Sequence, residues 1–238
     1  MKIYVDEVGY GAIAGPVLVC AVALSDDAIK VPGVKDSKQL SKKKREALYD
    51  KLKHIPHQFA IATPELVIEL NLHYARYDAM KRAVERFVGL NIEEVVVDGK
   101  FTIPNLHLPQ KAVIKGDAKY WQIGAASILA KVKRDRFMAS ITSLSEYSHY
   151  DWENNSGYYT PNHRDGIIKH GLTDWHRENH KYVQYSSFEH RGFLNSDEKD
   201  QYMKWVQAHK DDHGISRYGI WLRDHFKEEK KDWGESSW

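Results

Sequence analysis

The sequence predicts an α/β protein, because strand-like and helix-like segments alternate along residues 1–185. Residues 17–24 form a nearly continuous apolar run, as expected of a strand that is buried on both faces. Glycines and a proline separate this run from an apolar and aromatic strand at 3–5. The two strands are therefore expected to form a hairpin.

Further elements follow the hairpin in alternation. Ser41 precedes a lysine-rich segment and is a typical N-cap for a helix there. A third strand is expected at 57–62. Pro64 suits the first position of a helix, and alanines at intervals of four extend the helical pattern to Gly89, a typical stop.

The remaining segments complete the alternation. The β-branched triplet at 95–97 predicts a central strand, and 112–114 predicts another. Residues 124–138 have helical periodicity. Two more helices are expected in the C-terminal part, at about 197–210 and 217–231.

Composition excludes several classes of protein. No run of about 18 apolar residues exists, so we expect no membrane-spanning helix and no membrane partner. Acidic residues at 6 and 7 interrupt any signal-peptide core, so secretion is not expected. Cys20 is the sole cysteine, which excludes an internal disulfide framework and a cysteine-rich zinc site. We expect a cytoplasmic protein, because a reducing compartment fits this cysteine usage.

Charge and tryptophan content change near residue 186. Residues 1–185 carry 26 Lys and Arg against 22 Asp and Glu, whereas 186–238 carry 9 against 11. Four of the seven tryptophans lie in the second part. We expect a main domain at 1–185 and a helical extension at 186–238. The extension could flank a nucleic-acid groove or pack as a cap, and its net negative charge favours the cap.

Acidic residues stand where three predicted strands end. Asp6 and Glu7 follow the first strand, Asp98 follows the Val triplet, and Asp117 follows the strand at 112–114. In open α/β sheets, ligands collect just beyond strand ends. Four carboxylates meeting there would repel and raise each other's pKa unless a cation lay between them. All-oxygen ligand sets select Mg²⁺ or Mn²⁺, and such ions can activate water against a phosphodiester.

An alternative interpretation needs no metal. An Asp directly after a strand is commonly a turn former or a helix cap. Adjacent residues of a strand also point to opposite faces, so convergence of Asp6 and Glu7 requires a bend. Gly9 and Gly11 make such a bend plausible.

Seven short motifs lie in order along residues 1–180. They are Asp6-Glu7-Val8-Gly9-Tyr10-Gly11 with Ala14-Gly15-Pro16-Val17; Asp36-Ser37-Lys38-Gln39-Leu40-Ser41; Asn71 with Ala79-Met80 and Ala83; Val97-Asp98-Gly99; Lys115-Gly116-Asp117 with the helix at 125–135; Gly157-Tyr158 with Thr160 and His163; and His176-Arg177. Together they resemble the motifs of the ribonuclease HII family.

The resemblance implies a ribonuclease-H-like mixed sheet flanked by helices, with a helical C-terminal portion, and makes 1–185 the catalytic domain. It implies endonucleolytic cleavage of RNA in RNA–DNA hybrids, or in DNA containing ribonucleotides, with 3′-hydroxyl and 5′-phosphate products. Mg²⁺ or Mn²⁺ would be the cofactor. No protein partner is implied, and a monomer is expected. Asp6, Glu7, Asp98 and Asp117 would be the catalytic metal ligands.

The resemblance also implies the nucleic-acid contacts. The glycine loop would bring its backbone against the 2′-hydroxyl that separates RNA from DNA. Tyr158 would stack on the sugar at the RNA–DNA junction, and cationic side chains would bind phosphates. By spacing alone, Lys131 and Arg134 would instead lie on a solvated helix face. The full contact set is Gly9, Tyr10, Gly11, Ser37, Lys38, Asn71, Lys131, Arg134 and Tyr158.

Departures from the family pattern fall in the substrate-reading parts. Tyr10 stands where the family has arginine, Tyr159 where it has glycine, and Ser156 where lysine is common. We therefore expect retained chemistry with altered recognition of junctions and single ribonucleotides. Two alternatives stay open: a hybrid- or duplex-binding protein of the same fold that does not cut, and a nuclease with another duplex preference, such as RNA–RNA. His163 and His176 are expected to have structural roles.

Overall fold

The computed structural model describes residues 1–35 and 37–191, and five strands among them form one mixed sheet. The sheet order is β3-β2-β1-β4-β5. Antiparallel pairs join β1 to β2 and β2 to β3, whereas β4 lies parallel to both β1 and β5. The strands are β1 (Lys2–Val8), β2 (Val17–Leu24), β3 (His57–Ala62), β4 (Glu94–Asp98) and β5 (Gln110–Val113).

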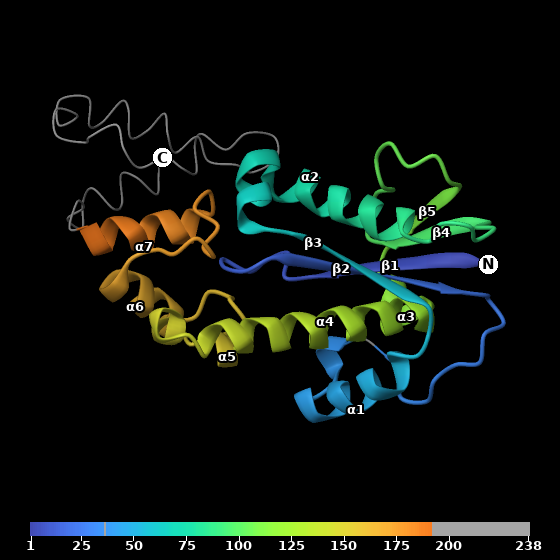
Figure 1. The fold of residues 1–238 in the computed structure, drawn as a ribbon, viewed down its shortest axis with the longest axis horizontal. Coiled ribbons are helices and arrows are strands. Elements are labelled where there is room, and N and C mark those ends of the chain that lie inside the picture. Colours follow the sequence, from blue (N-terminus) through green and yellow to red (C-terminus); the bar gives the residue numbers. More distant parts are fainter. Residues whose placement is uncertain (36, 192–238) are drawn as a thin grey trace.

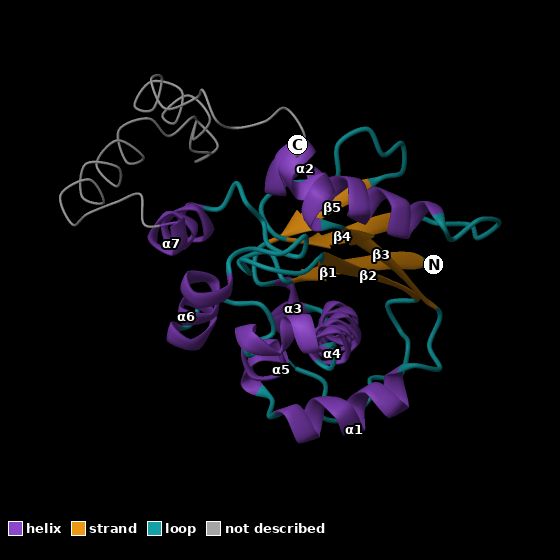
Figure 2. Cartoon of the chain, turned by 60° about the vertical axis from the view of Figure 1, so that its left-hand side comes forward, coloured by secondary structure: helices purple, strands orange, loops and turns teal. Residues whose placement is uncertain are grey.

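Helices cover both faces of the sheet (Figure 1). Figure 2 shows α2 above the strands, α3 and α4 below them, and α1 outermost on the α4 side. The described helices and 3₁₀ turns are η1 (Ser37–Gln39), α1 (Lys42–Leu52), α2 (Pro64–Glu85), α3 (Gly116–Lys119), α4 (Trp121–Thr142), η2 (Ser145–Tyr150), α5 (Trp152–Asn155), α6 (Pro161–His170) and α7 (Lys181–Arg191). This arrangement confirms the predicted α/β class.

Strand alternation sorts apolar side chains into two cores. Ile3 and Val5 pack in the core on the α2 side, whereas Tyr4 packs in the core on the α4 side. A third cluster, containing Ile13 and Trp152, joins the loop after β1 to the C-terminal helices. The end of the sheet where β1 finishes is therefore covered by chain from residues beyond 130.

Most elements lie where the sequence predicts them. The hairpin of β1 and β2 is present, β2 is buried along nearly its whole length, and the Ser41 hydroxyl accepts a bond from the Lys44 N–H at 3.3 Å. One expectation is wrong: β1 continues to Val8, so Asp6 and Glu7 lie inside the strand.

The C-terminal expectations are only partly covered. α7 begins at Lys181 and continues through the expected domain boundary at 186. The helices expected at 197–210 and 217–231 lie outside the described residues. Within the described part of the chain, no helix is both long and apolar enough to span a bilayer.

The long helix α2 is interrupted at Asn71, and it ends at Glu85 rather than at Gly89. Asn71 has φ 62° and ψ 162°, a conformation that residues other than glycine rarely adopt. Its Oδ1 accepts bonds from the N–H groups of His73 (2.9 Å) and Tyr74 (3.3 Å). Asn71 therefore serves as an internal N-cap that restarts the helix.

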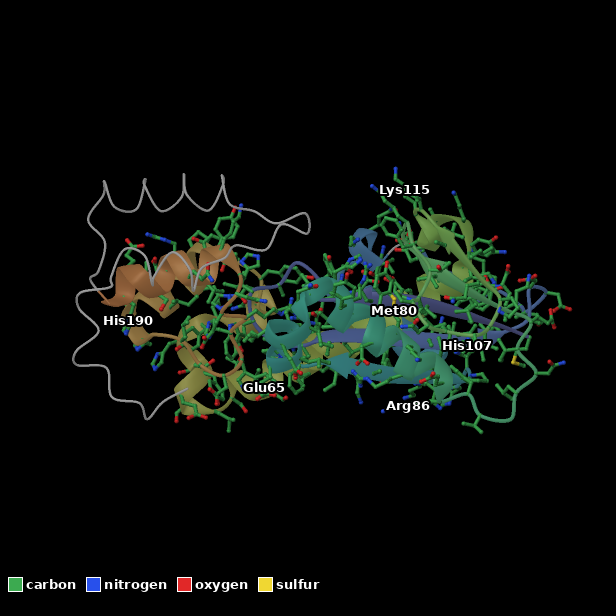
Figure 3. The ribbon with its side chains drawn as sticks, turned by 90° about the horizontal axis from the view of Figure 1, so that it is seen from above. Glu65, Met80, Arg86, His107, Lys115 and His190 are labelled. Atoms are coloured by element: carbon green, nitrogen blue, oxygen red, sulfur yellow. The ribbon has the colours of Figure 1, made fainter. Side chains whose placement is uncertain are left out.

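Figure 3 looks down on α2, with Glu65 at the end toward α7 and Arg86 at the opposite end. The restarted segment after Asn71 lies over the core that contains Ile3 and Val5. The kink thus sets the direction of the helical segment that approaches the end of β1.

Two substitutions at Asn71 separate its cap from its backbone conformation. Asn71→Ala should lower the free energy of unfolding by about 1–2 kcal/mol, because it loses the cap and keeps a side chain at a strained φ. Asn71→Gly should cost only a few tenths of a kcal/mol, because glycine accepts that backbone. Urea denaturation measures both, and equal losses would contradict the strained conformation.

Candidate active site

Parallel pairing of β1 with β4 brings two carboxylates together. Val5 pairs with Val97, so Asp6 and Asp98 follow one position later on neighbouring strands. Alternation places both on the α4 side of the sheet, with Tyr4 and Val96. The register of β1 against β4, which the sequence alone does not show, therefore brings the first two carboxylates of the site together.

Asp6 is buried, with 6% of its surface exposed. Burial raises the pKa of its carboxyl well above the ordinary range, and the charges of Glu7 and Asp98 raise it further. Hydrogen bonds from the Ser127 hydroxyl and from the Glu7 N–H (2.7 Å to Oδ1) act in the opposite direction. Asp6 is thus held in place at an electrostatic cost to its charged form.

Glu7 lies on the opposite face of β1, toward α2. Burial raises the pKa of its carboxyl, the Arg76 guanidinium lowers it, and the charge of Asp98 raises it again. Arg76 Nη1 lies 3.4 Å from Glu7 Oε1. The other oxygen, Oε2, is buried and has no hydrogen-bond partner. One carboxylate oxygen of Glu7, Oε2, is therefore available as a ligand, and the charge of Asp98 acts on it.

Gly116 connects Asp98 to α3. Its N–H donates to Asp98 Oδ1 at 2.7 Å, and a Cβ there would lie 3.0 Å from the same oxygen. Asp117 follows directly and is half-buried. Its side chain borders a surface hollow that Lys35 and Lys119 also line. Asp117 therefore follows directly after a residue that bonds Asp98, at the edge of the sheet where β4 and β5 end.

The donor set fits a hard divalent cation. Asp6, Glu7, Asp98 and Asp117 offer carboxylate oxygens only, and one of those oxygens is buried without a partner. Across residues 1–35 and 37–191, however, no three His, Cys, Asp or Glu side chains converge tightly enough to grip an ion as they stand. Like charges repel, so side-chain rotation must complete any such site.

Arg134 corrects an expectation. The motif resemblance placed it among the phosphate contacts, yet its side chain is fully buried. Its guanidinium donates to the carbonyl oxygens of Pro16 (2.8 Å), Ser156 (2.6 Å) and Ala14 (3.0 Å). Burial lowers the pKa of this guanidinium. Arg134 joins the glycine loop to the Ser156 segment and does not reach a surface phosphate.

Arg177 completes the attachment of the glycine loop. It is also buried, and it donates to the carbonyls of Gly15 (2.8 and 3.0 Å), Ala12 (2.8 Å) and Tyr10 (3.0 Å). Burial and the charge of Arg134 lower the pKa of Arg177 to about 9. Sequence reasoning matched Arg177 to a family motif and assigned it no role.

Gly9 serves packing within the protein. It has φ 89°, and a Cβ there would lie 2.2 Å from Arg134 Nε. Among the described residues, a Cβ at Gly11 would approach only the Tyr158 ring, at 4.0 Å. The space beside Gly11 is therefore the part of the loop that is open to a ligand.

Tyr158 and Lys131 border one groove, which Lys42, Arg45, Asn154 and Asn155 also line. Lys131 Nζ lies 5.6 Å from the Tyr158 ring centre and 2.7 Å from Asp135 Oδ1. Both side chains are half-buried at this groove, and their contacts with a nucleic acid stay a prediction. Tyr159, the family glycine position, instead stacks on Tyr182 with ring centres 4.6 Å apart.

The remaining expected contact residues divide between surface and interior. Lys38 is exposed, and Tyr10 is 37% exposed. Ser37 is buried, and its hydroxyl lies 2.9 Å from the hydroxyl of Ser127. Ser127 in turn bonds Asp6, so Ser37 supports a carboxylate. Asn71 caps the second segment of α2.

A buried histidine pair supports the Tyr158 segment. His163 Nδ1 lies 2.9 Å from the Tyr158 carbonyl, which fixes Nδ1 as the donor. His163 Nε2 accepts from Trp152 Nε1 at 2.9 Å and lies 3.1 Å from His176 Nε2. Burial lowers the pKa of His163 to about 4 and that of His176 to about 3. Both rings are therefore neutral at physiological pH, and their structural role agrees with expectation.

Solved ribonuclease structures share this fold. The PCNA:RNase HII complex from Archaeoglobus fulgidus matches with a TM-score of 0.64 and 28% identity, covering 76% of this chain and 95% of that chain. Bst-RNase HIII in complex with Mn²⁺ matches with a TM-score of 0.59 and 15% identity, over 80% of this chain and 70% of that one. The shared fold, together with 28% identity to a solved ribonuclease HII, places the chain in the ribonuclease H class of nucleases.

The family follows from the sequence comparisons. The model of the Ribonuclease HII family matches residues 3–186. Ribonuclease HII from Caldicellulosiruptor saccharolyticus is 44% identical over 176 residues, which cover 73% of this chain and 83% of that protein. The chain therefore belongs to the ribonuclease HII family and is a type 2 ribonuclease H.

The histidine pair predicts an acid-labile fold. An unfolded His176 binds a proton near pH 6.5, whereas the folded one binds it near pH 3, so falling pH favours unfolding within that window. Between pH 7 and pH 5 this histidine alone should cost about 2 kcal/mol of unfolding free energy. Chemical denaturation at both pH values measures the loss.

The matched variant is His176→Gln, whose side-chain amide can still donate toward His163 and cannot titrate. Its stability should fall less between pH 7 and pH 5, by about 2 kcal/mol, than that of the unsubstituted protein. The same pH dependence in both proteins would contradict the buried neutral histidine.

Proposed function

We propose that this ribonuclease is a divalent-metal-dependent endonuclease that hydrolyses the RNA strand of RNA–DNA hybrids. The observation that carries the proposal is the pairing of β1 with β4, which sets the buried Asp6 opposite Asp98, with Glu7 next in the chain. Such crowding is stable chiefly when a cation binds among the carboxylates. The Mn²⁺ complex of a fold neighbour and membership of the ribonuclease HII family support the choice of metal and substrate.

Asp6, Glu7, Asp98 and Asp117 would hold Mg²⁺ or Mn²⁺. When bound, such a cation lowers the pKa of water and stabilises charge on the leaving oxygen. The chain's own contribution is to fix Asp6 through Ser127 and Asp98 through Gly116. Water attacks phosphorus and the ribose 3′ oxygen leaves, so the products carry 3′-hydroxyl and 5′-phosphate ends.

Substrate binding would use the surface around this edge. The open loop at Gly11 would approach the 2′-hydroxyl, with the Tyr158 ring beside it for the sugar. Lys38 and Lys131 would bind phosphates without reading sequence. Monomeric action without a protein partner stays a prediction.

Removal of one carboxylate charge tests the mechanism. Asp98→Asn should lower the Mg²⁺- or Mn²⁺-dependent cleavage rate on a labelled RNA–DNA hybrid by at least about 100-fold, because a metal ligand loses its charge. Asp50→Asn makes the same chemical change on α1, in a surface ion pair with Lys53, and should cut normally.

Parallel assays on DNA with one ribonucleotide and on RNA–RNA define the substrate. Unchanged cleavage by Asp98→Asn would remove the proposed mechanism. Binding without cleavage of any of the three duplexes would favour a non-cutting protein of this fold, and preferential cutting of RNA–RNA would favour the other alternative.

Tyr10 predicts weak cleavage at a single embedded ribonucleotide. Tyr10→Arg adds a guanidinium to the loop, and one charge-assisted hydrogen bond corresponds to about a tenfold gain in kcat/KM. The ratio of kcat/KM on single-ribonucleotide DNA to that on the full hybrid should rise by about that factor, and Tyr10→Phe should not raise it. Equal ratios for Tyr10 and Tyr10→Arg would refute the role of this position.

A further inference from the structure

Arg76 of α2 lies between the acidic site and the glycine loop. Its guanidinium carbon is 4.4 Å from the ring centre of Tyr77 and 5.0 Å from that of Tyr10. Its Nη1 is 3.4 Å from Glu7 Oε1. One cation therefore contacts both an expected metal ligand and the residue that departs from the family pattern. Neither the sequence patterns nor the proposed function uses it.

The ion pair of Arg76 and Glu7 is incomplete. Among the described residues, Arg76 Nε and Glu7 Oε2 are the buried side-chain atoms that lack a hydrogen-bond partner. Buried polar groups almost always have partners, so such atoms call for an explanation. A donor without a partner suits an anion, and an acceptor without a partner suits a cation. A phosphodiester and a divalent metal supply those two charges.

The negative charge of the carboxylates must be offset before a phosphate can bind beside them, and the Arg76 guanidinium is placed to do so. The carboxylates repel a phosphate backbone, and Arg76 and Lys38 are the cations whose charges lower the pKa of Glu7. The loop itself carries Tyr10 where the family has arginine. The side chains of Arg76 and Glu7 retain 14% and 15% exposure, so the pair borders solvent.

We propose that Arg76 binds a phosphate of the nucleic-acid substrate beside the acidic site, in place of the loop arginine that Tyr10 replaces. The proposal rests on the proposed function, because it assumes that the acidic site faces a phosphodiester backbone. A planar guanidinium can stack between two rings, contact Glu7 and still present N–H donors to a second anion. Lysine offers the charge without that geometry.

Steady-state kinetics on an RNA–DNA hybrid tests the proposal. Arg76→Ala should raise KM by about tenfold and change kcat by less than about threefold, because a substrate contact is lost. The slope of log KM against log salt concentration should fall by about one, the value for one phosphate contact. Arg76→Lys should restore the slope and only part of KM.

Arg82→Ala is the matched control. It removes the same charge from the same helix, at a residue paired with Asp78, and should leave KM and the salt slope unchanged. The double variant Tyr10→Arg, Arg76→Ala returns a guanidinium from the loop and should recover most of the lost KM. Thermal unfolding identifies a variant that fails to fold, and if Arg76→Ala does so, the conservative variant Arg76→Lys decides.

Two results would overturn the proposal. One is a KM and salt slope in Arg76→Ala equal to those of Arg82→Ala. The other is a loss of kcat alone, which would assign Arg76 only to holding Glu7. Fluorescence anisotropy with a labelled hybrid in EDTA measures binding apart from cleavage. If the protein cuts no duplex, the proposed function fails, whereas the effect of Arg76→Ala on binding still decides this inference.

Discussion

The parallel pairing of β1 with β4 is the constraint on which the site depends. It fixes Asp6 and Asp98 on one face of neighbouring strands, where burial and the charges of Glu7 and Asp98 raise the pKa of Asp6. Neighbouring groups stabilise these carboxylates. Ser127 and the Glu7 N–H donate to Asp6, and the Gly116 N–H donates to Asp98. Arg76 pairs with Glu7.

A second constraint joins the glycine loop to the C-terminal helices. Arg134 and Arg177 are buried cations whose partners are backbone carbonyls of residues 10–16 and 156. A buried charge is tolerated only when its donors are satisfied, and these two are satisfied by a loop that has no other regular structure. The same guanidiniums thus determine where Gly11 and Tyr158 lie relative to the carboxylates. Two fully buried side chains thus connect the proposed substrate contacts to the proposed metal ligands.

Much of this arrangement could be predicted from local sequence, and the rest required the fold. Apolar periodicity located most strands and helices, and the acidic residues near strand ends indicated the candidate site. The expected position of Asp6 and Glu7 at the end of the first strand was wrong, because β1 continues to Val8 and both residues lie within it. The burial of Arg134 could have been predicted from the sequence. Apolar residues at intervals of four, Ala126, Ala130 and Met138, share its face of the helix, and all three are buried. No local sequence pattern could have predicted the contact of Arg76 with Glu7, because 69 residues separate them in the chain.

If a divalent cation binds among Asp6, Glu7 and Asp98, it must lower the electrostatic repulsion between these carboxylates. Carboxyl ¹³C NMR titration of the labelled protein, with and without Mg²⁺, tests it most directly. The Asp6 carboxyl should titrate well above the ordinary aspartate pKa without Mg²⁺, and Mg²⁺ should lower its apparent pKa. An Asp6 carboxyl that titrates at the ordinary value and does not respond to Mg²⁺ would show that no cation binds among these carboxylates.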